Sequence, residues 1–294
     1  MVLTPQGSPA KLSDAREASD NSTVSPAGLM STLRLISTDF DGTIHSDTEV
    51  PGIPLSLQRR LVDLQAAGVR WVINTGRDRA SLAATLAEVS MAARPDFLVL
   101  VEREVYVREE RGFVPLGGWN RRCDEDHQQV FERVRVDLDG LTAWIRSRFD
   151  ATVYSDPWSP LCLMARTNRD ADAVMVRLEE YCAGVPDLAV MRNDVYARFC
   201  HRAYHKGSAL AEIGRHLGVG PAEILAAGDQ LNDLPMLVPE VARWLVAPAN
   251  AIEPVKAAVR RAGGHVSGRP AGHGVEEALG RLTPSLRQTP RIPV

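Results

Sequence analysis

The sequence lacks long apolar runs and has few cysteines. Its longest clean apolar stretch, Phe97–Val101, is far shorter than the ~20 residues that a membrane-spanning helix needs, so we expect no membrane partner. The N-terminus has no compact apolar segment of the signal-peptide kind, which favours a cytoplasmic protein. The cysteines form no Cys-x-x-Cys pair and stand among apolar residues, which indicates reduced, packed thiols rather than a zinc site or disulfides. They are Cys123, Cys162, Cys182 and Cys200.

An excess of positive charge is also missing. The 294 residues carry 34 Lys+Arg against 37 Asp+Glu, a formal net charge of -3. A protein that coats a nucleic-acid duplex normally carries a surplus of Lys and Arg, so we expect no nucleic-acid partner. A partner that bears phosphate would therefore have to be held at a local site.

The two ends of the chain contain few large apolar side chains. Residues 1–31 are rich in Ser, Ala, Asp and Pro and cannot bury enough surface to offset the entropy of ordering, so we expect a disordered extension. Residues 282–294 include three prolines and are expected to form a flexible tail. The length of the remainder suggests more than one domain.

Strand-like and helical patterns alternate in two stretches, 32–119 and 202–281. This alternation predicts an α/β core with a Rossmann-like, doubly wound parallel sheet that has helices on both faces. The elements that we expect are strands at 33–38, 69–74, 97–101, 223–227 and 244–247, and helices at 57–67, 80–92, 207–217, from 233 and at 251–262.

The stretch between them, residues 120–201, has a different order of elements. A helical run to 149 is followed by two strand-like runs, a helix at about 169–183 and two more strand-like runs. This αββαββ order predicts an inserted α+β domain with a small, largely antiparallel sheet and helices on one face.

Polar clusters follow three of the predicted core strands. Asp39 and Asp41 follow the first strand, residues 75–77 follow the second, and Asp229 and Asp233 follow a later one. In doubly wound sheets such strand ends converge on the ligand. Carboxylates without a nearby His or Cys favour a hard cation such as Mg²⁺ over zinc.

These residue types suit phosphoryl transfer. A cation, the ammonium of Lys206 and the hydroxyl of Thr75 would neutralise phosphoryl oxygens while Asp39 attacks phosphorus and becomes an aspartyl-phosphate. Asp41 would give a proton to the leaving alcohol and later take one from water.

Two residues of the first turn would shape the site. Gly42 lets the backbone turn its N–H groups toward a phosphate, and Thr43 would hydrogen-bond across the turn. Each of these residues also has a structural interpretation. An isolated Asp-x-Asp-Gly-Thr turn is often only a solvated turn, and Asp229 and Asp233 could also act as helix caps. Lys206, taken alone, would most often lie on the surface.

Four short motifs occur in a fixed order: DFDGT (39–43), NTGR (74–77), HKG (205–207) and GDQLND (228–233). Together they resemble the four motifs of the haloacid dehalogenase-like phosphohydrolase superfamily. The αββαββ insertion between the second and third motifs is similar to the branch of sugar-phosphate phosphatases with a large α/β cap, which includes sucrose-phosphate and mannosyl-phosphoglycerate phosphatases. The resemblance runs from about Leu33 to Leu279.

The resemblance implies a role for each motif residue. Asp39 would be the nucleophile, Asp41 the acid/base, and Arg77 would contact the substrate or brace the site, with Thr43 as a further bracing residue. The phosphoryl group would be held by Gly42, Thr75, Gly76, Lys206 and Asn232. Mg²⁺ would be bound by Asp39, the backbone carbonyl of Asp41, Asp229 and Asp233.

One departure concerns the leaving group rather than phosphoryl transfer. Relatives usually have Asn-Gly-Ala after the third strand, whereas this chain has Glu102, Arg103 and Glu104. The aromatic side chains of the inserted domain either fill its core or stack on a sugar. They are Trp119, Tyr154, Trp158 and Tyr196.

We therefore predict a Mg²⁺-dependent phosphomonoester hydrolase that acts on a phosphorylated sugar or similar small metabolite, as a monomer or homodimer. One alternative is a sugar phosphomutase or phosphotransferase, because an aspartyl-phosphate can also pass to a sugar hydroxyl. The other is a non-catalytic protein of the same fold that binds a phosphorylated ligand.

Overall fold

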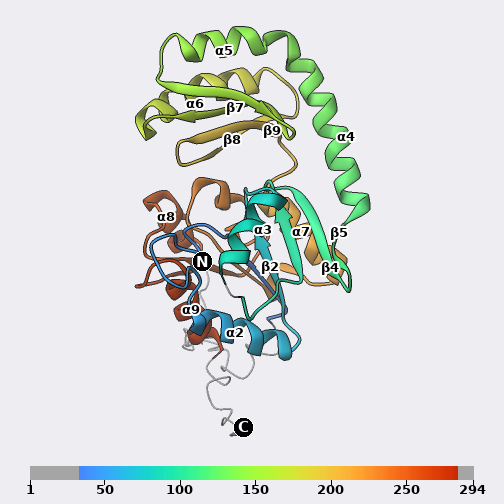
Figure 1. Cartoon of the computed structure of the whole chain (residues 1–294), viewed down its shortest axis with the longest axis vertical. Coiled ribbons are helices and arrows are strands. Elements are labelled where there is room, and N and C mark those ends of the chain that lie inside the picture. Colours follow the sequence, from blue (N-terminus) through green and yellow to red (C-terminus); the bar gives the residue numbers. More distant parts are fainter. Residues whose placement is uncertain (1–32, 90, 284–294) are drawn as a thin grey trace, which may run out of the picture.

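The core is built on an eight-stranded sheet in the order β12-β11-β10-β1-β2-β3-β4-β5. The computed structural model describes residues 33–89 and 91–283 (Figure 1). The core strands are β1 (Leu35–Thr38), β2 (Arg70–Asn74), β3 (Phe97–Leu100), β4 (Glu104–Glu109), β5 (Gly112–Pro115), β10 (Ile224–Ala227), β11 (Trp244–Ala247) and β12 (His265–Val266).

Six neighbouring strands, from β12 to β3, pair in parallel, as the alternation predicts. The hairpin of β4 and β5 adds two antiparallel strands at the edge next to β3. This hairpin was not expected, because its residues are partly exposed and charged and do not read as a buried strand. The fold is nevertheless the predicted α/β fold with a mostly parallel core sheet.

Helices cover both faces of the core sheet. On one face lie α2 (Leu55–Ala66), α3 (Arg79–Glu88) and α9 (Ala271–Leu282), and on the other lie α7 (Lys206–Leu217) and α8 (Glu253–Arg261). The spacing of Leu57, Leu61 and Leu64 places all three on the buried side of α2, where each is at most 1% exposed. The burial of these apolar stripes fixes the helices against the sheet.

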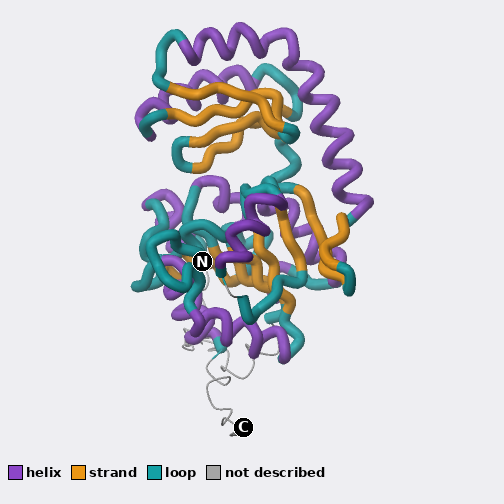
Figure 2. The backbone as a smooth tube through the Cα atoms, viewed as in Figure 1, coloured by secondary structure: helices purple, strands orange, loops and turns teal. Residues whose placement is uncertain are grey.

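The inserted domain lies over one end of the core as a cap (Figure 1). Its sheet has the order β6-β7-β9-β8, and all three pairings are antiparallel. Figure 1 and Figure 2 show the helices at Leu138–Arg146 and Asn168–Ala183 on the far side of this sheet from the core, so the sheet itself faces the core. The cap elements are α4 (Gly117–Val134), η1 (Arg135–Asp137), α5 (Leu138–Arg146), β6 (Ala151–Asp156), β7 (Ser159–Ala165), α6 (Asn168–Ala183), β8 (Leu188–Asn193) and β9 (Tyr196–His201).

The alternation of side chains along the cap strands decides which residues face the core. Val153, Leu163 and Ala197 are buried in the apolar cluster under the cap helices. Residues one position away therefore point to the other face of the sheet. The strand register aligns four of them in one row, Tyr154, Cys162, Arg198 and Met191.

Several expectations concern the ends and the cysteines. The expected extension at 1–31 and nearly all of the expected tail at 282–294 lie outside the described residues, while Leu282 ends α9. The expected boundary between 119 and 120 falls within the first turn of α4. No helix within residues 33–89 and 91–283 is long and apolar enough to cross a membrane. All four cysteines are buried and free, as predicted.

Candidate active site

Three parallel core strands deliver their C-terminal residues to the same edge of the sheet. Asp39 follows β1, Thr75 follows β2 and Asp229 lies just beyond β10. The strands β10, β1 and β2 are direct neighbours, so these three residues converge. The short 3-10 helix η3 (Leu231–Met236) adds Asp233 to the same place.

Lys206 is the fully buried cation of this site. Its Nζ atom lies 2.5 Å from Oδ1 of Asp39 and 2.6 Å from Oδ1 of Asp233. Burial alone would lower the pKa of Lys206, but the negative charges of Asp233 and Asp39 outweigh it and raise the pKa above its usual value. The chain has only three lysines among 34 Lys+Arg, the others being Lys11 and Lys256. A compact ammonium fits between two carboxylates where a planar guanidinium would not.

The position of Lys206 depends on how α7 begins. The imidazole Nδ1 of His205 accepts two backbone N–H groups of the first turn, at 3.2 Å each. This N-cap fixes the start of the helix, so that Lys206, the first helical residue, points into the site. The HKG motif predicts the contact of Lys206 with the phosphoryl group but not the capping role of His205.

Three buried carboxylates form one cluster, and their combined negative charge exceeds the positive charge of the single lysine. Asp39, Asp229 and Asp233 each offer an oxygen, and these oxygens lie within 4.8 Å of one another. Burial raises the pKa of Asp39 well above its ordinary range. Burial and the neighbouring charge of Asp233 raise the pKa of Asp229 to about 7. A set of oxygen ligands with surplus negative charge could hold a hard cation. The side chain of Asp41 is not part of this cluster.

The turn after β1 holds Asp229 in place. The hydroxyl of Thr43 donates a hydrogen bond of 2.7 Å to Oδ1 of Asp229. Gly42 has φ +74°, and a Cβ atom there would come within 2.5 Å of Oδ2 of Asp229. Thr43 was expected to hydrogen-bond across the turn, and its hydroxyl donates to the buried carboxylate of Asp229.

Asp41 and Arg77 form a separate pair at the cavity edge. The Nε and Nη2 atoms of Arg77 each donate to one carboxylate oxygen of Asp41, both at 2.7 Å. The remaining Nη1 donates to the hydroxyls of Ser81 and Thr85 on α3. The guanidinium also lies 5.5 Å from the centre of the Phe40 ring. Arg77 thus braces Asp41 against α3.

Thr75 and Asn232 are two further buried polar residues of the site. The buried hydroxyl of Thr75 accepts the backbone N–H of Arg77 at 3.1 Å, which orients it. The amide Nδ2 of Asn232 donates to Oε1 of Glu102 at 2.7 Å, and its Oδ1 has no hydrogen-bond partner in the described part of the chain. Glu102, which departs from the pattern usual in relatives, thus contacts a predicted site residue, a contact that the sequence does not predict.

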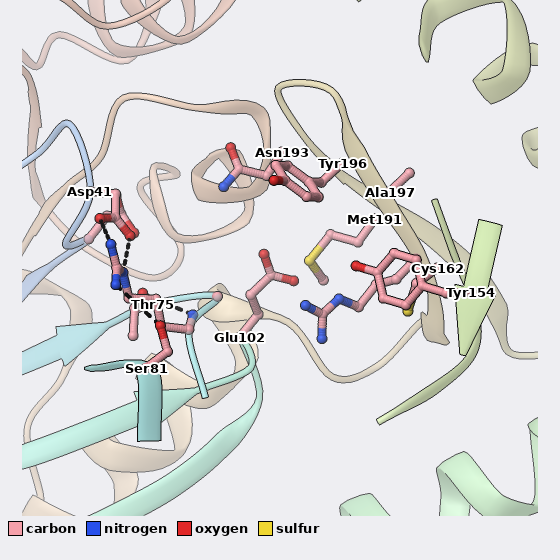
Figure 3. A pocket seen from close by; sticks show the side chains of 14 residues that line it. Asp41, Thr75, Ser81, Glu102, Tyr154, Cys162, Met191, Asn193, Tyr196 and Ala197 are labelled. Atoms are coloured by element: carbon pink, nitrogen blue, oxygen red, sulfur yellow. Dashed lines mark hydrogen bonds and ion pairs between the residues drawn. The ribbon is translucent and has the colours of Figure 1, made fainter. Parts of the chain in front are cut away.

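A cavity of about 450 Å³ separates these core residues from the cap sheet (Figure 3). The cap side of the cavity includes the predicted aromatic candidates Tyr154 and Tyr196. Trp119 and Trp158 do not line it. The core contributes Asp39, Asp41, Thr75, Gly76, Arg77, Ser81 and Glu102, and the cap contributes Tyr154, Cys162, Met191, Asn193, Tyr196, Ala197 and Arg198. The buried residues Lys206, Asp229, Asn232 and Asp233 lie behind this surface.

A doubly wound core, an acidic strand-end site and an inserted cap define a class of capped α/β enzymes. The profile of the haloacid dehalogenase-like hydrolase family matches residues 150–279, from the start of β6 to α9. This match and the shared capped fold bear out the predicted resemblance to haloacid dehalogenase-like hydrolases with a cap, and with it the prediction of an enzyme.

Solved structures share this architecture. The chain is similar to the sucrose-phosphatase from Synechocystis sp. PCC6803 in complex with sucrose and phosphate, with 22% identity, a TM-score of 0.64 and coverage of 85% of this chain and 98% of that one. It is also similar to a haloacid dehalogenase-like hydrolase from Bacteroides thetaiotaomicron (20% identity, TM-score 0.59, 85% and 99% covered). The C-terminal domain of C. albicans trehalose-6-phosphate phosphatase gives 17% identity, TM-score 0.59 and coverage of 88% and 96%. At these identities the likeness establishes the shared fold.

Proposed function

We propose that this protein is a Mg²⁺-dependent phosphomonoester hydrolase that works through an aspartyl-phosphate and acts on a phosphorylated sugar or a similar small metabolite. The observation that carries the proposal is the buried ammonium of Lys206 between Asp39 and Asp233, with Asp39 also lining the cavity. Such an arrangement supplies both a nucleophile and a fixed positive charge at one point.

Two carboxyl groups have different roles in the reaction: Asp39 is the nucleophile and Asp41 transfers protons. A carboxylate oxygen of Asp39 attacks phosphorus, the ester P–O bond breaks, and the leaving alkoxide takes a proton from the carboxyl group of Asp41. A water molecule then attacks phosphorus in the aspartyl-phosphate and gives a proton to Asp41, which releases inorganic phosphate and restores both residues. The double hydrogen bond from Arg77 orients Asp41 for this work.

The phosphoryl oxygens need donors and positive charge. Lys206 supplies the charge, and the hydroxyl of Thr75 and the amide of Asn232 are the side-chain donors. Gly42 and Gly76 leave room for backbone N–H groups to approach the phosphoryl group.

The acidic cluster fits a divalent cation. Asp39, the backbone carbonyl of Asp41, Asp229 and Asp233 would hold Mg²⁺, which supplies positive charge that offsets the charge of the phosphoryl oxygens. The surplus of carboxylates over the single ammonium of Lys206 supports this assignment, because buried charge of one sign is costly unless it is compensated.

The cap would supply the pocket for the leaving group. Tyr154 and Tyr196 line the cavity opposite Asp39, and flat aromatic rings suit the faces of a sugar. The similar sucrose-phosphatase was solved with sucrose and phosphate, which supports a sugar phosphate as the substrate class here. A closed cap would also keep bulk water from the aspartyl-phosphate.

The test is a phosphate-release assay over phosphorylated sugars, glycerates and nucleotides, with Mg²⁺ or with EDTA. We expect Mg²⁺-dependent release that Asp39→Asn abolishes. Asp47→Asn is the matched control, because Asp47 lies in the same loop region with 85% of its side chain exposed and should retain full activity. Unchanged activity of Asp39→Asn would contradict the proposal. An isomeric ester instead of inorganic phosphate would identify a phosphomutase, and ligand binding without release would identify a non-catalytic binder.

A further inference from the structure

Glu102 is a buried carboxylate at the site that the chemistry above does not use. It is only 5% exposed and has φ +69°, a left-handed backbone conformation that non-glycine residues seldom adopt. Its backbone N–H donates to the carbonyl of Thr75 at 2.9 Å, so the strained turn is tied directly to the phosphate side of the site. Strain of this kind concentrates at functional positions.

The two carboxylate oxygens of Glu102 have different surroundings. Oε1 accepts the amide of Asn232 at 2.7 Å and lies 3.2 Å from the position that a Cβ atom on Gly76 would occupy. Within the described part of the chain, no donor reaches Oε2. Figure 3 shows the carboxylate of Glu102 projecting into the space between Thr75 on the core and Met191 and Tyr154 on the cap.

The cap presents hydrogen-bond donors across from this carboxylate. The row that contains Tyr154 and Arg198 crosses the face of the cap sheet that lines the cavity, and Tyr196 and Asn193 pair in the next row. Among residues 33–89 and 91–283, the buried Nη1 of Arg198 has no hydrogen-bond partner, and the carboxylate of Asp156 lies 3.9 Å from it. A ligand in this space would meet an acceptor on the core side and donors on the cap side.

We propose that Glu102 is a specificity-determining residue that accepts hydrogen bonds from hydroxyl groups of a polyhydroxylated leaving group. The inference rests on the proposed phosphatase function, because it places the phosphoryl group at Asp39 and the leaving group in the cavity beyond it. A leaving group without hydroxyls leaves the free oxygen of Glu102 desolvated and unpaired, and sites built around such a group discriminate strongly.

The test compares kcat/KM for sugar phosphates with kcat/KM for phenyl phosphate, whose leaving group carries no further hydroxyl. The sugar panel is glucose 6-phosphate, mannose 6-phosphate, sucrose 6-phosphate and trehalose 6-phosphate. Glu102→Gln keeps the volume and the contact with Asn232 but turns a donor toward the cavity. We expect the ratio for the best sugar phosphate over phenyl phosphate to fall about tenfold to a hundredfold. Glu109→Gln, at the exposed end of β4, removes the same charge and should leave the ratio unchanged.

Two results would overturn the inference. One is a wild-type enzyme that prefers no sugar phosphate over phenyl phosphate. The other is an unchanged ratio in Glu102→Gln, including an equal loss on both esters, which would mean that Glu102 only positions Asn232.

A binding measurement separates this inference from the proposed function. In an Asp39→Asn background, calorimetry gives the affinity for each sugar phosphate and for phenyl phosphate with and without Glu102→Gln. If the wild type releases no phosphate but sugar binding depends on Glu102, the proposed function fails, while the role of Glu102 as an acceptor for ligand hydroxyl groups stands. If esters are hydrolysed and neither measurement depends on Glu102, the inference fails and the function stands.

Discussion

Both carboxylate oxygens of Asp41 are held by one guanidinium, that of Arg77, through two hydrogen bonds of 2.7 Å. Arg77 is itself anchored on α3 by the hydroxyls of Ser81 and Thr85. A bidentate contact of this kind fixes the plane of the carboxylate as well as its position. The orientation of the proposed acid/base therefore depends on a helix that contributes nothing else to the chemistry.

Arg77→Lys tests this dependence. A lysine keeps the charge but offers a single point of contact, so Asp41 loses its fixed plane. We expect kcat to fall about tenfold to a hundredfold, because small misplacements of a catalytic group cost that much. Steady-state kinetics on the best substrate measure the change. Arg79→Lys serves as the control, because Arg79 makes an exposed contact with the carbonyl of Phe113. If Arg77→Lys has the same kcat as the wild type, then the double hydrogen bond from Arg77 to Asp41 is not needed for catalysis.

Removal of the buried ammonium is expected to affect stability as well as activity. In Lys206→Met, Asp39 and Asp233 lose the cation that lies within 2.6 Å of each. We expect the free energy of unfolding at pH 8 in EDTA to fall by about 3–5 kcal/mol, the cost of leaving a buried charge without its partner. The loss should shrink at pH 5, because burial raises the pKa of Asp39 and its protonation removes part of the uncompensated charge. Urea unfolding at both pH values measures this.

The control for that experiment is Lys256→Met on α8, the only other lysine in the described part of the chain. It should change stability little and show no such pH dependence. Equal stability of Lys206→Met and Lys256→Met at pH 8 would contradict the reading of Lys206 as the compensating charge.

Much of the site could be predicted from local sequence. Asp39 and Asp229 each follow a short buried strand, and parallel strands of neighbouring position must bring their C-terminal ends together. The role of Lys206 at the site is predictable because this residue begins a helix at the point where the chain returns from the inserted domain to the core. In each case the information lies in a few consecutive residues and in the order of the elements.

The remaining features depend on contacts between distant segments. Glu102 enters the site because a left-handed turn after β3 directs it to Asn232, 130 residues further along the chain. Arg198 faces the cavity only because of the register between β7, β8 and β9. The β4–β5 hairpin pairs at a sheet edge whose charged side chains conceal the strand pattern. Patterns among neighbouring residues do not predict contacts between segments that are far apart in the sequence.

Asp229 gives the protein a pH dependence that Mg²⁺ should remove. Burial and the charge of Asp233 raise its pKa from 3.8 to about 7 in the folded state. The folded state therefore binds more protons than the unfolded state between about pH 4 and 7, so this contribution to stability is present below that window and is lost as the pH rises through 7. In EDTA we expect the free energy of unfolding to fall by a few kcal/mol between pH 5 and 8.

Mg²⁺ requires the ionised carboxylate, so the stabilisation that it provides should grow over the same pH range. Urea unfolding at pH 5, 6, 7 and 8, with EDTA or Mg²⁺, measures both effects. Asp229→Asn should remove most of the pH dependence of stability in EDTA and of the stabilisation by Mg²⁺. The exposed Asp47→Asn should leave both pH dependences as in the wild type. A Mg²⁺ effect on stability that persists in Asp229→Asn would place the metal elsewhere.

Alanine substitutions at two glycines with similar backbone conformations distinguish backbone strain in a turn from displacement of a site residue. Gly42 and Gly68 both have positive φ, +74° and +92°, so an alanine at either position is strained by about 1 kcal/mol. A Cβ atom at Gly68 meets open space, whereas one at Gly42 would lie 2.5 Å from Oδ2 of Asp229. Gly68→Ala should therefore lose stability alone. Gly42→Ala should lose more stability and at least about tenfold in kcat, because Asp229 must move. If the two variants have equal kcat, then the position of Asp229 does not depend on the turn that follows β1.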